Sequence, residues 1–178
     1  MSERQVALIR GINVGRAKRI AMADLRALAE GLGYTEVTTL LNSGNLIYTA
    51  PRRQKDPAAK LQQAMTAELG VTARVIVLSA SEVDAIIAGN PLTAQADDPS
   101  RLLVSVLADA RDAERARTLR ATSPEAIAVG PRAVYLWCAH GILESKAPEA
   151  LAKLLGNAHT ARNWATMLKI QALLHSVD

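Results

Sequence analysis

The sequence predicts an α+β protein made of two ferredoxin-like units, of the α/β-plait type, followed by a C-terminal helix. Short apolar runs typical of strands alternate with segments whose apolar residues recur at helical spacing. In the first half these segments follow the order β-α-β-β-α-β, and a similar order begins again after residue 100. The 178 residues, 49% of them hydrophobic, suffice for one ordinary core or two small ones.

The first half contains six expected elements. Residues 5–9 form a strand that is apolar on both faces, which is typical of a central position in a sheet. A helix begins at Met22 and ends near Gly31 and Gly33. The other expected elements are strands at 37–41 and 46–50, a helix from Pro57 to Gly70, and a strand at 73–78. The turn-forming residues 42–45 join the two middle strands into a hairpin.

The second half repeats this architecture without repeating its residues. We predict a first domain at residues 1–78, a linker with a short helix at 79–100, and a second domain at 101–178. The expected elements of the second domain are strands at 101–108, 126–129 and 133–138 and helices at 112–120, 148–155 and 162–174. For a fourth strand only the short stretch 157–161 is available, and the sequence leaves that strand open.

The basic character of the chain belongs to its first half. The formal net charge is +4; residues 1–78 carry 11 Lys and Arg against 6 Asp and Glu, and residues 79–178 carry 10 against 11. This asymmetry is compatible with an anionic partner, although many proteins carry such a bias for solubility alone. No apolar run approaches the ~18 residues that span a bilayer, and no signal-peptide pattern is present. We therefore expect a cytoplasmic protein without a membrane partner.

The single cysteine, Cys138, limits the chemistry available to the chain. It excludes an internal disulfide, an iron–sulfur cluster and a cysteine-cluster metal site, and its apolar neighbours predict a small buried residue. The three histidines are scattered and form no metal-binding pattern, so we expect no metal and no cofactor. Adjacent Ser145 and Lys146 match no known nucleophile–base spacing. With no catalytic residues visible, the sequence favours a protein that is not an enzyme but leaves an enzyme open.

The loop after the first strand is the strongest candidate for a ligand site. Residues 10–19 read Arg-Gly-Ile-Asn-Val-Gly-Arg-Ala-Lys-Arg and include no acidic residue. Because glycines let backbone N–H groups turn toward a ligand and cations supply charge, this composition suits an anion. The loop is neither a Walker A loop nor a G-x-G-x-x-G fingerprint. The alternative is an ordinary β-to-α connection whose glycines relieve a tight turn and whose cations are solvated.

The hairpin at residues 42–45 is a second candidate. Asn, Ser and Gly are the residues that such a turn requires, so a purely structural role explains the hairpin as well. We expect the strand after the hairpin to run parallel to the first strand, which places the hairpin and the basic loop at opposite ends of the sheet. The two loops are then not expected to touch one ligand within one domain, unless a partner domain brings either into a site.

The C-terminal segment places a cation at an expected helix start. Thr160 is the expected N-cap, and Arg162, Thr166 and Lys169 then fall on one stripe of the helix. An arginine in the first turn opposes the helix dipole, at a cost of a few tenths to ~1 kcal/mol. A carboxylate of the chain itself, a bound anion and plain solvent exposure are the three explanations that the sequence leaves open.

Five stretches of the chain also carry a family resemblance. They are Leu8-Ile9-Arg10-Gly11-Ile12-Asn13-Val14-Gly15, Met22-Ala23-Asp24-Leu25-Arg26, Asn42-Ser43-Gly44-Asn45, Ser145-Lys146 and Thr160-Ala161-Arg162-Asn163-Trp164-Ala165-Thr166. Together they resemble the bacterial domain-of-unknown-function 1697 family, over essentially the whole chain. The resemblance implies a two-part α+β fold of ferredoxin-like units and implies no activity. Arg16 and Arg19 stand where the family typically has a second glycine and an asparagine, which makes this loop more basic and less flexible.

From these motifs we predict a binding protein in which polar and basic residues line a cleft between two α/β units. The expected partner is a small anionic ligand, such as a nucleotide or a phosphorylated metabolite. The alternatives are sequence-tolerant nucleic-acid binding and a structural or interaction protein whose motifs lock the two halves together. The sequence assigns neither the ligand's identity nor an oligomeric state. The candidate ligand-binding residues are Arg10, Gly11, Asn13, Gly15, Lys18, Ser43, Asn45, Ser145, Lys146, Arg162, Asn163 and Lys169.

Overall fold

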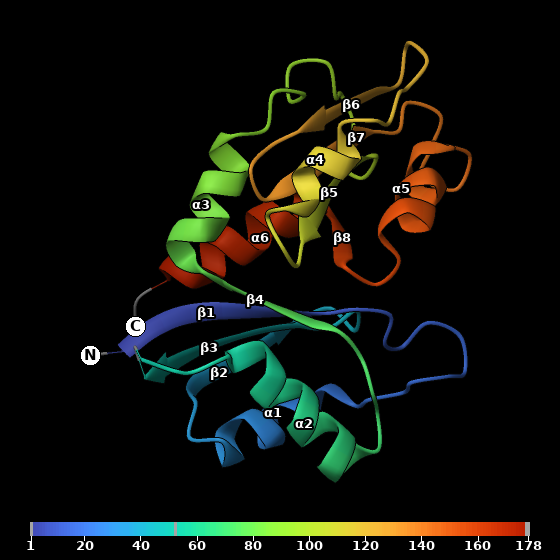
Figure 1. The fold of residues 1–178 in the computed structure, drawn as a ribbon. Coiled ribbons are helices and arrows are strands. Elements are labelled where there is room, and N and C mark those ends of the chain that lie inside the picture. The colour runs from blue at the N-terminus through green and yellow to red at the C-terminus, as the bar shows by residue number, and fades with distance from the viewer. Residues whose placement is uncertain (1, 52, 177–178) are drawn as a thin grey trace. The chain divides into compact units, whose positions relative to one another are not determined.

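The computed structural model describes residues 2–51 and 53–176 and contains two four-stranded antiparallel sheets (Figure 1). The first sheet has the order β2 (Thr35–Leu40), β3 (Asn45–Pro51), β1 (Ser2–Ile9) and β4 (Val75–Ser79). The second has the order β6 (Ala126–Val129), β7 (Ala133–Trp137), β5 (Leu102–Leu107) and β8 (His159–Asn163). Each order is that of a ferredoxin-like unit, so the predicted fold class is confirmed.

Two helices cover one face of the first sheet (Figure 1). They are α1 (Met22–Gly31) and α2 (Pro57–Leu69), which also contact each other. Local chemistry sets the ends of α2, because the Asp56 carboxylate accepts a hydrogen bond from the Ala59 N–H at 3.1 Å and Gly70 adopts φ 66° at its end. Beneath the helices, the rings of Tyr34 and Tyr48 stack with centroids 4.3 Å apart.

The orientation of β3 corrects one prediction. β3 runs antiparallel to β1, with Leu8 opposite Asn45 and Ser2 opposite Pro51. In a β-α-β-β order the helical crossover returns the second strand parallel to the first, and the hairpin then reverses the chain. The expected parallel orientation was therefore wrong. The last residues of β1 and the first residues of β3 lie at the same end of the sheet.

The second unit packs a smaller core. Helices α4 (Asp112–Ala116) and α5 (Ala147–Leu155) contact each other over β5 and β7. Cys138 lies in this core at 1% exposure, as its apolar neighbours predicted, and burial raises the pKa of its thiol. The helix expected to reach residue 120 ends at Ala116.

The fourth strand of the second sheet forms at β8, beside β5, and it shifts the start of the last helix. Val104 lies opposite Arg162, and Val106 lies opposite Thr160. Because strand pairing takes up the backbone of these residues, α6 (Trp164–His175) begins two residues later than expected. The cap is Asn163, whose side-chain oxygen accepts a hydrogen bond from the backbone N–H of Thr166 at 2.9 Å. The predicted N-cap at Thr160 and the helical position of Arg162 were therefore wrong.

The chain forms two compact units, which divide at two points. One division falls between Glu82 and Val83 within α3 (Ala80–Ala88), and the other between Lys169 and Ile170 within α6. The last turns of α6 thus belong with β1–β4. The predicted domain boundaries after residues 78 and 100 stay a prediction.

Among the helices formed by the described residues, none is both long and apolar enough to cross a membrane.

Candidate functional site

Three connecting segments meet at one end of the first sheet. They are the loop after β1 (residues 10–21), the β2–β3 hairpin (41–44) and the segment before β4 (70–74). The Ile9 N–H donates to the Gly44 carbonyl and the Arg10 N–H donates to the Arg74 carbonyl, both at 2.9 Å. The hairpin and the basic loop are therefore neighbours within one unit, which overturns their expected placement at opposite ends.

Asn13 ties two of these segments together. Its side-chain Nδ2 donates to the carbonyl of Ile20 at 2.9 Å and to the carbonyl of Asn42 at 2.8 Å. Its side-chain oxygen accepts from the Ile20 N–H at 2.8 Å. Asn13 adopts φ 56°, a conformation that asparagine tolerates better than most residues do. Since the amide is fully engaged inside the protein, Asn13 shapes the site and leaves ligand contacts to its neighbours.

Gly44 allows the hairpin to approach the first loop closely. It adopts φ +90°, and an added Cβ would lie 3.0 Å from Cβ of Ile9 and from Cδ1 of Ile12. Ile9 and Ile12 are themselves buried at 1% exposure. The hairpin can therefore pack against the start of the loop only because residue 44 has no side chain.

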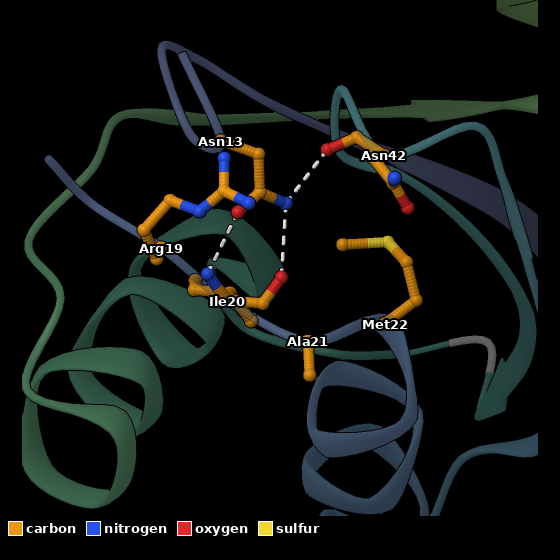
Figure 2. A pocket seen from close by; sticks show the side chains of 6 residues that line it. All are labelled: Asn13, Arg19, Ile20, Ala21, Met22 and Asn42. Atoms are coloured by element: carbon orange, nitrogen blue, oxygen red, sulfur yellow. Dashed lines mark hydrogen bonds between the residues drawn. The ribbon is translucent and has the colours of Figure 1, made fainter. Parts of the chain in front are cut away.

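An open pocket of about 320 Å³ lies between the first loop and the hairpin (Figure 2). Figure 2 shows Arg19 and Asn13 on one side of the pocket and Met22 and Asn42 on the other. The lining residues are Asn13, Arg19, Ile20, Ala21, Met22 and Asn42. The volume lies within the range of small-molecule sites, roughly 300–1,000 Å³.

Two features make the pocket favourable for an anion. Helix α1 begins at Met22, in the pocket lining, and no side chain caps its first N–H groups. A helix N-terminus carries partial positive charge and presents N–H donors. Arg19 is exposed and adds a guanidinium, which one hydrogen bond to the Gly15 carbonyl at 3.2 Å orients. The first-turn carboxylate, Asp24, is exposed and does not line the pocket.

The three connecting segments carry charge of one sign. The segments 10–21, 41–44 and 70–74 contain no Asp or Glu. We call this surface the basic end of the first sheet. Its five cations are Arg10, Arg16, Lys18, Arg19 and Arg74. These segments contribute five cations and no carboxylate, so their own net charge is positive.

The candidate residues of the first unit divide into shaping residues and exposed ones. Gly11 and Gly15 take φ 70° and φ 65° with open space around them, so the backbone conformation is what requires glycine. Asn45 is fully buried, and its side chain donates to the Leu40 carbonyl at 2.8 Å and to Ser43 Oγ at 3.2 Å, which closes the hairpin. Lys18 is exposed, also with positive φ.

Three of the candidate residues of the second unit form internal hydrogen bonds. Ser145 is buried, and its hydroxyl donates to the Glu125 carboxylate. Arg162 is 8% exposed, and its Nη1 lies 2.9 Å from Thr160 Oγ1 and 2.8 Å from the Ala161 carbonyl. Asn163 caps α6, as described above, while Lys146 and Lys169 are exposed.

Of the six residues that line the pocket, only Asn13 was among the ligand contacts predicted from the sequence. Arg19 belonged to the candidate loop at residues 10–19 and Asn42 to the candidate hairpin at 42–45, but neither was named as a ligand contact, and Ile20, Ala21 and Met22 were not proposed for a ligand site. The position of Met22 as the first residue of an expected helix was the one available signal, because a helix N-terminus is an anion site.

Among residues 2–51 and 53–176, no three His, Cys, Asp or Glu side chains gather in a group that could hold a metal ion.

Comparisons with known proteins identify relatives by sequence and by fold. The profile of a family described as "Protein of unknown function (DUF1697)" matches residues 2–135. The chain is similar in structure to the conserved bacterial protein SP0830 from Streptococcus pneumoniae, with a TM-score of 0.75 and 22% sequence identity. That similarity covers 98% of this chain and 99% of the other, and at this identity it shows the fold alone. No curated protein matches the chain significantly.

Proposed function

Because the chain belongs to the DUF1697 family, whose function is unknown, we propose a function from its own residues: it binds a small anionic ligand at the basic end of the first sheet. The ligand is a nucleotide or a phosphorylated metabolite. A cytoplasmic location is part of this proposal, because phosphorylated metabolites are held inside cells.

The observation that carries the proposal is that a guanidinium and a helix N-terminus lie at the same pocket. Arg19 and the uncapped start of α1 face the same pocket, at an end of the sheet whose segments contain no acidic residue. Helix N-termini and guanidinium groups both bind phosphate well, and both are present at this pocket. The segments that hold them are fixed to one another by the hydrogen bonds of Asn13, so little ordering is needed on binding.

Sequence-tolerant nucleic-acid binding is the second candidate. It is favoured by Arg16, Lys18 and Arg74, which are exposed at the basic end but do not line the pocket. Proteins that bind single strands also need aromatic side chains on which bases stack. The segments of the basic end contain no Phe, Trp or Tyr. The small-ligand proposal is therefore the stronger of the two.

Calorimetric titration of the full chain with AMP and with inorganic phosphate tests the proposal. Arg19→Gln is expected to weaken binding by about 10-fold or more, because it removes a charge-assisted hydrogen bond worth ~1.5–3 kcal/mol. Lys55→Gln is the matched control. Lys55 is an exposed cation between β3 and α2, at the opposite end of the same sheet. Equal binding by both variants, or binding of neither probe to the wild type, would contradict the proposal.

The salt dependence of the binding affinity distinguishes the two candidate functions. A mononucleotide carries no condensed counterions to release, so its affinity falls only weakly with salt concentration. A single strand that contacts several of the exposed cations loses affinity with a slope of about 0.7 for each phosphate contact. Measuring the affinity for AMP and for a short oligonucleotide between 50 and 200 mM salt gives both slopes. Tight, steeply salt-dependent oligonucleotide binding without AMP binding would favour the nucleic-acid function.

A further inference from the structure

We infer that the ligand of this pocket is a nucleoside phosphate, with its phosphate at Arg19 and the start of α1 and its base against Met22 and Asn42. The inference rests on the proposed function and narrows it from small anions in general to one chemical class. The inference depends on the residues that line the pocket on the side away from Arg19.

The pocket has an apolar side opposite Arg19. Met22 is half-buried and lines the pocket, and Ile20 and Ala21 continue this surface. In Figure 2 the side chain of Met22 rises from the helix start on the Asn42 side of the pocket, and its terminal methyl group turns back over the pocket toward Asn13. A thioether makes favourable contacts with aromatic rings, and a flat base offers such a ring. A ligand that is anionic throughout would leave this surface without a matching group.

Asn42 supplies a polar group suited to the edge of a base. Its backbone carbonyl accepts the hydrogen bond from Asn13, while its exposed side chain lines the pocket. A carboxamide carries a donor and an acceptor side by side, the pair that reads adenine and other base edges. Asn42 can therefore contact a ligand through its side chain without giving up the bond that fixes the hairpin.

The size of the pocket agrees with a phosphate on one side and a base on the other. A phosphate group alone would fill only a small part of about 320 Å³, whereas a mononucleotide is a small molecule of the size that such sites hold. The anion would occupy one side, and the sugar and base would occupy the remainder. Small-molecule sites usually combine apolar surface with a few placed polar groups in this way.

A calorimetric series tests the inference with AMP, ribose 5-phosphate and inorganic phosphate as probes. We expect the wild type to bind AMP about 10-fold more tightly than ribose 5-phosphate, because only AMP carries the base. Asn42→Ala is expected to reduce that preference about 3- to 10-fold, the effect of one hydrogen bond. This substitution keeps the backbone carbonyl of residue 42, so the bond from Asn13 is preserved.

The outcomes separate the inference from the proposed function. If ribose 5-phosphate and AMP bind equally and Arg19→Gln weakens both, the anion site stands and the inference is overturned. A wild-type preference for AMP that survives both Asn42→Ala and Met22→Gln also overturns it. If no probe binds the wild type, both the proposed function and the inference fail. A preference for AMP that Asn42→Ala reduces, with Lys55→Gln behaving as wild type, supports the inference.

Discussion

The side chain of Asn13 donates a hydrogen bond to the backbone carbonyl of Asn42 at 2.8 Å, across 29 residues of sequence. This contact joins the loop after β1 to the β2–β3 hairpin, and the pocket lies between the two segments. The same side chain donates to the carbonyl of Ile20 and accepts from the N–H of Ile20, two residues before α1 begins. One asparagine thereby fixes the relative positions of the loop, the hairpin and the helix start.

Substitution of Asn13 is expected to lower stability through two separable effects. Asn13→Gly removes three hydrogen bonds but keeps a residue at ease with φ 56°, and we expect a loss of ~1–3 kcal/mol in the free energy of unfolding. Asn13→Ala adds backbone strain of ~1 kcal/mol. Urea denaturation of both variants measures the two contributions. Equal stability of Asn13→Gly and the wild type would show that these bonds do not hold the loop.

The close approach at Gly44 can be tested against a glycine of the same conformation. Gly44→Ala is expected to lose ~1–3 kcal/mol more than Gly33→Ala, because its new Cβ meets Ile9 and Ile12 at 3.0 Å. Gly33 has φ +89°, nearly that of Gly44, and open space around it. Both variants therefore carry the backbone strain, and only one carries the crowding. Similar denaturation midpoints for the two would contradict the packing described here.

Arg4 links β2 to the end of the last helix, both of which belong to the first unit. Its Nη2 donates to the Leu173 carbonyl at 3.0 Å, and its Nη1 donates to the Glu36 carbonyl at 3.0 Å. Arg4→Met keeps the apolar stem and removes these donors, so we expect a loss of ~1–3 kcal/mol by chemical denaturation. Hydrogen exchange in the last turn of α6 should accelerate in the same variant. Unchanged exchange there would show that another contact holds the helix end.

Removing a hydroxyl from the first core is expected to be harmless at one tyrosine and costly at its stacked neighbour. The Tyr48 hydroxyl is buried with no hydrogen-bond partner among the described residues, and burial raises its pKa. Tyr48→Phe should therefore leave the unfolding free energy unchanged or raise it by up to ~1 kcal/mol. Tyr34→Phe breaks the bond to Gln54 at 3.2 Å and should cost ~0.5–1.5 kcal/mol. The reverse order of the two effects would refute this assignment.

Asp109 should titrate well below its ordinary range. The hydrogen bonds from Arg111, at 2.7 Å from Nη2 to Oδ2, lower the pKa of its carboxyl to about 2. Because the folded-state pKa lies below the unfolded value of ~3.9, the resulting stabilisation is complete above about pH 4 and is lost as the pH falls toward 2. Arg111→Gln should raise the pKa, as followed by the carboxyl carbon resonance. An ordinary pKa in the wild type would contradict the pairing.

Most of the fold follows from sequence patterns, and the start of the last helix shows where local patterns fail. Helix α2 was predicted with both ends because Pro57 and Gly70 mark them locally. The segment His159–Asn163 was misread because its strand character comes from pairing with β5, a partner more than 50 residues away. Local signals favoured a helix start at Thr160, and tertiary pairing overrode them.

The candidate site was predicted in its chemistry more than in its geometry. The cations and glycines of residues 10–19 indicated an anion site directly. The contribution of Asn42 was missed because β3 was expected to run parallel to β1, although the predicted β-α-β-β order itself requires the antiparallel orientation. Met22 was predicted as the start of a helix, but its place in the pocket depends on how the loop folds back through Asn13.

Backbone amide NMR during titration with AMP tests the central claim most directly, because it locates the ligand without any substitution. We predict that the largest shift changes fall on Asn13, on residues 19–22 and on Asn42, around the pocket at the basic end of the first sheet. Saturable changes confined to residues of the second sheet, or no saturable change anywhere, would contradict it.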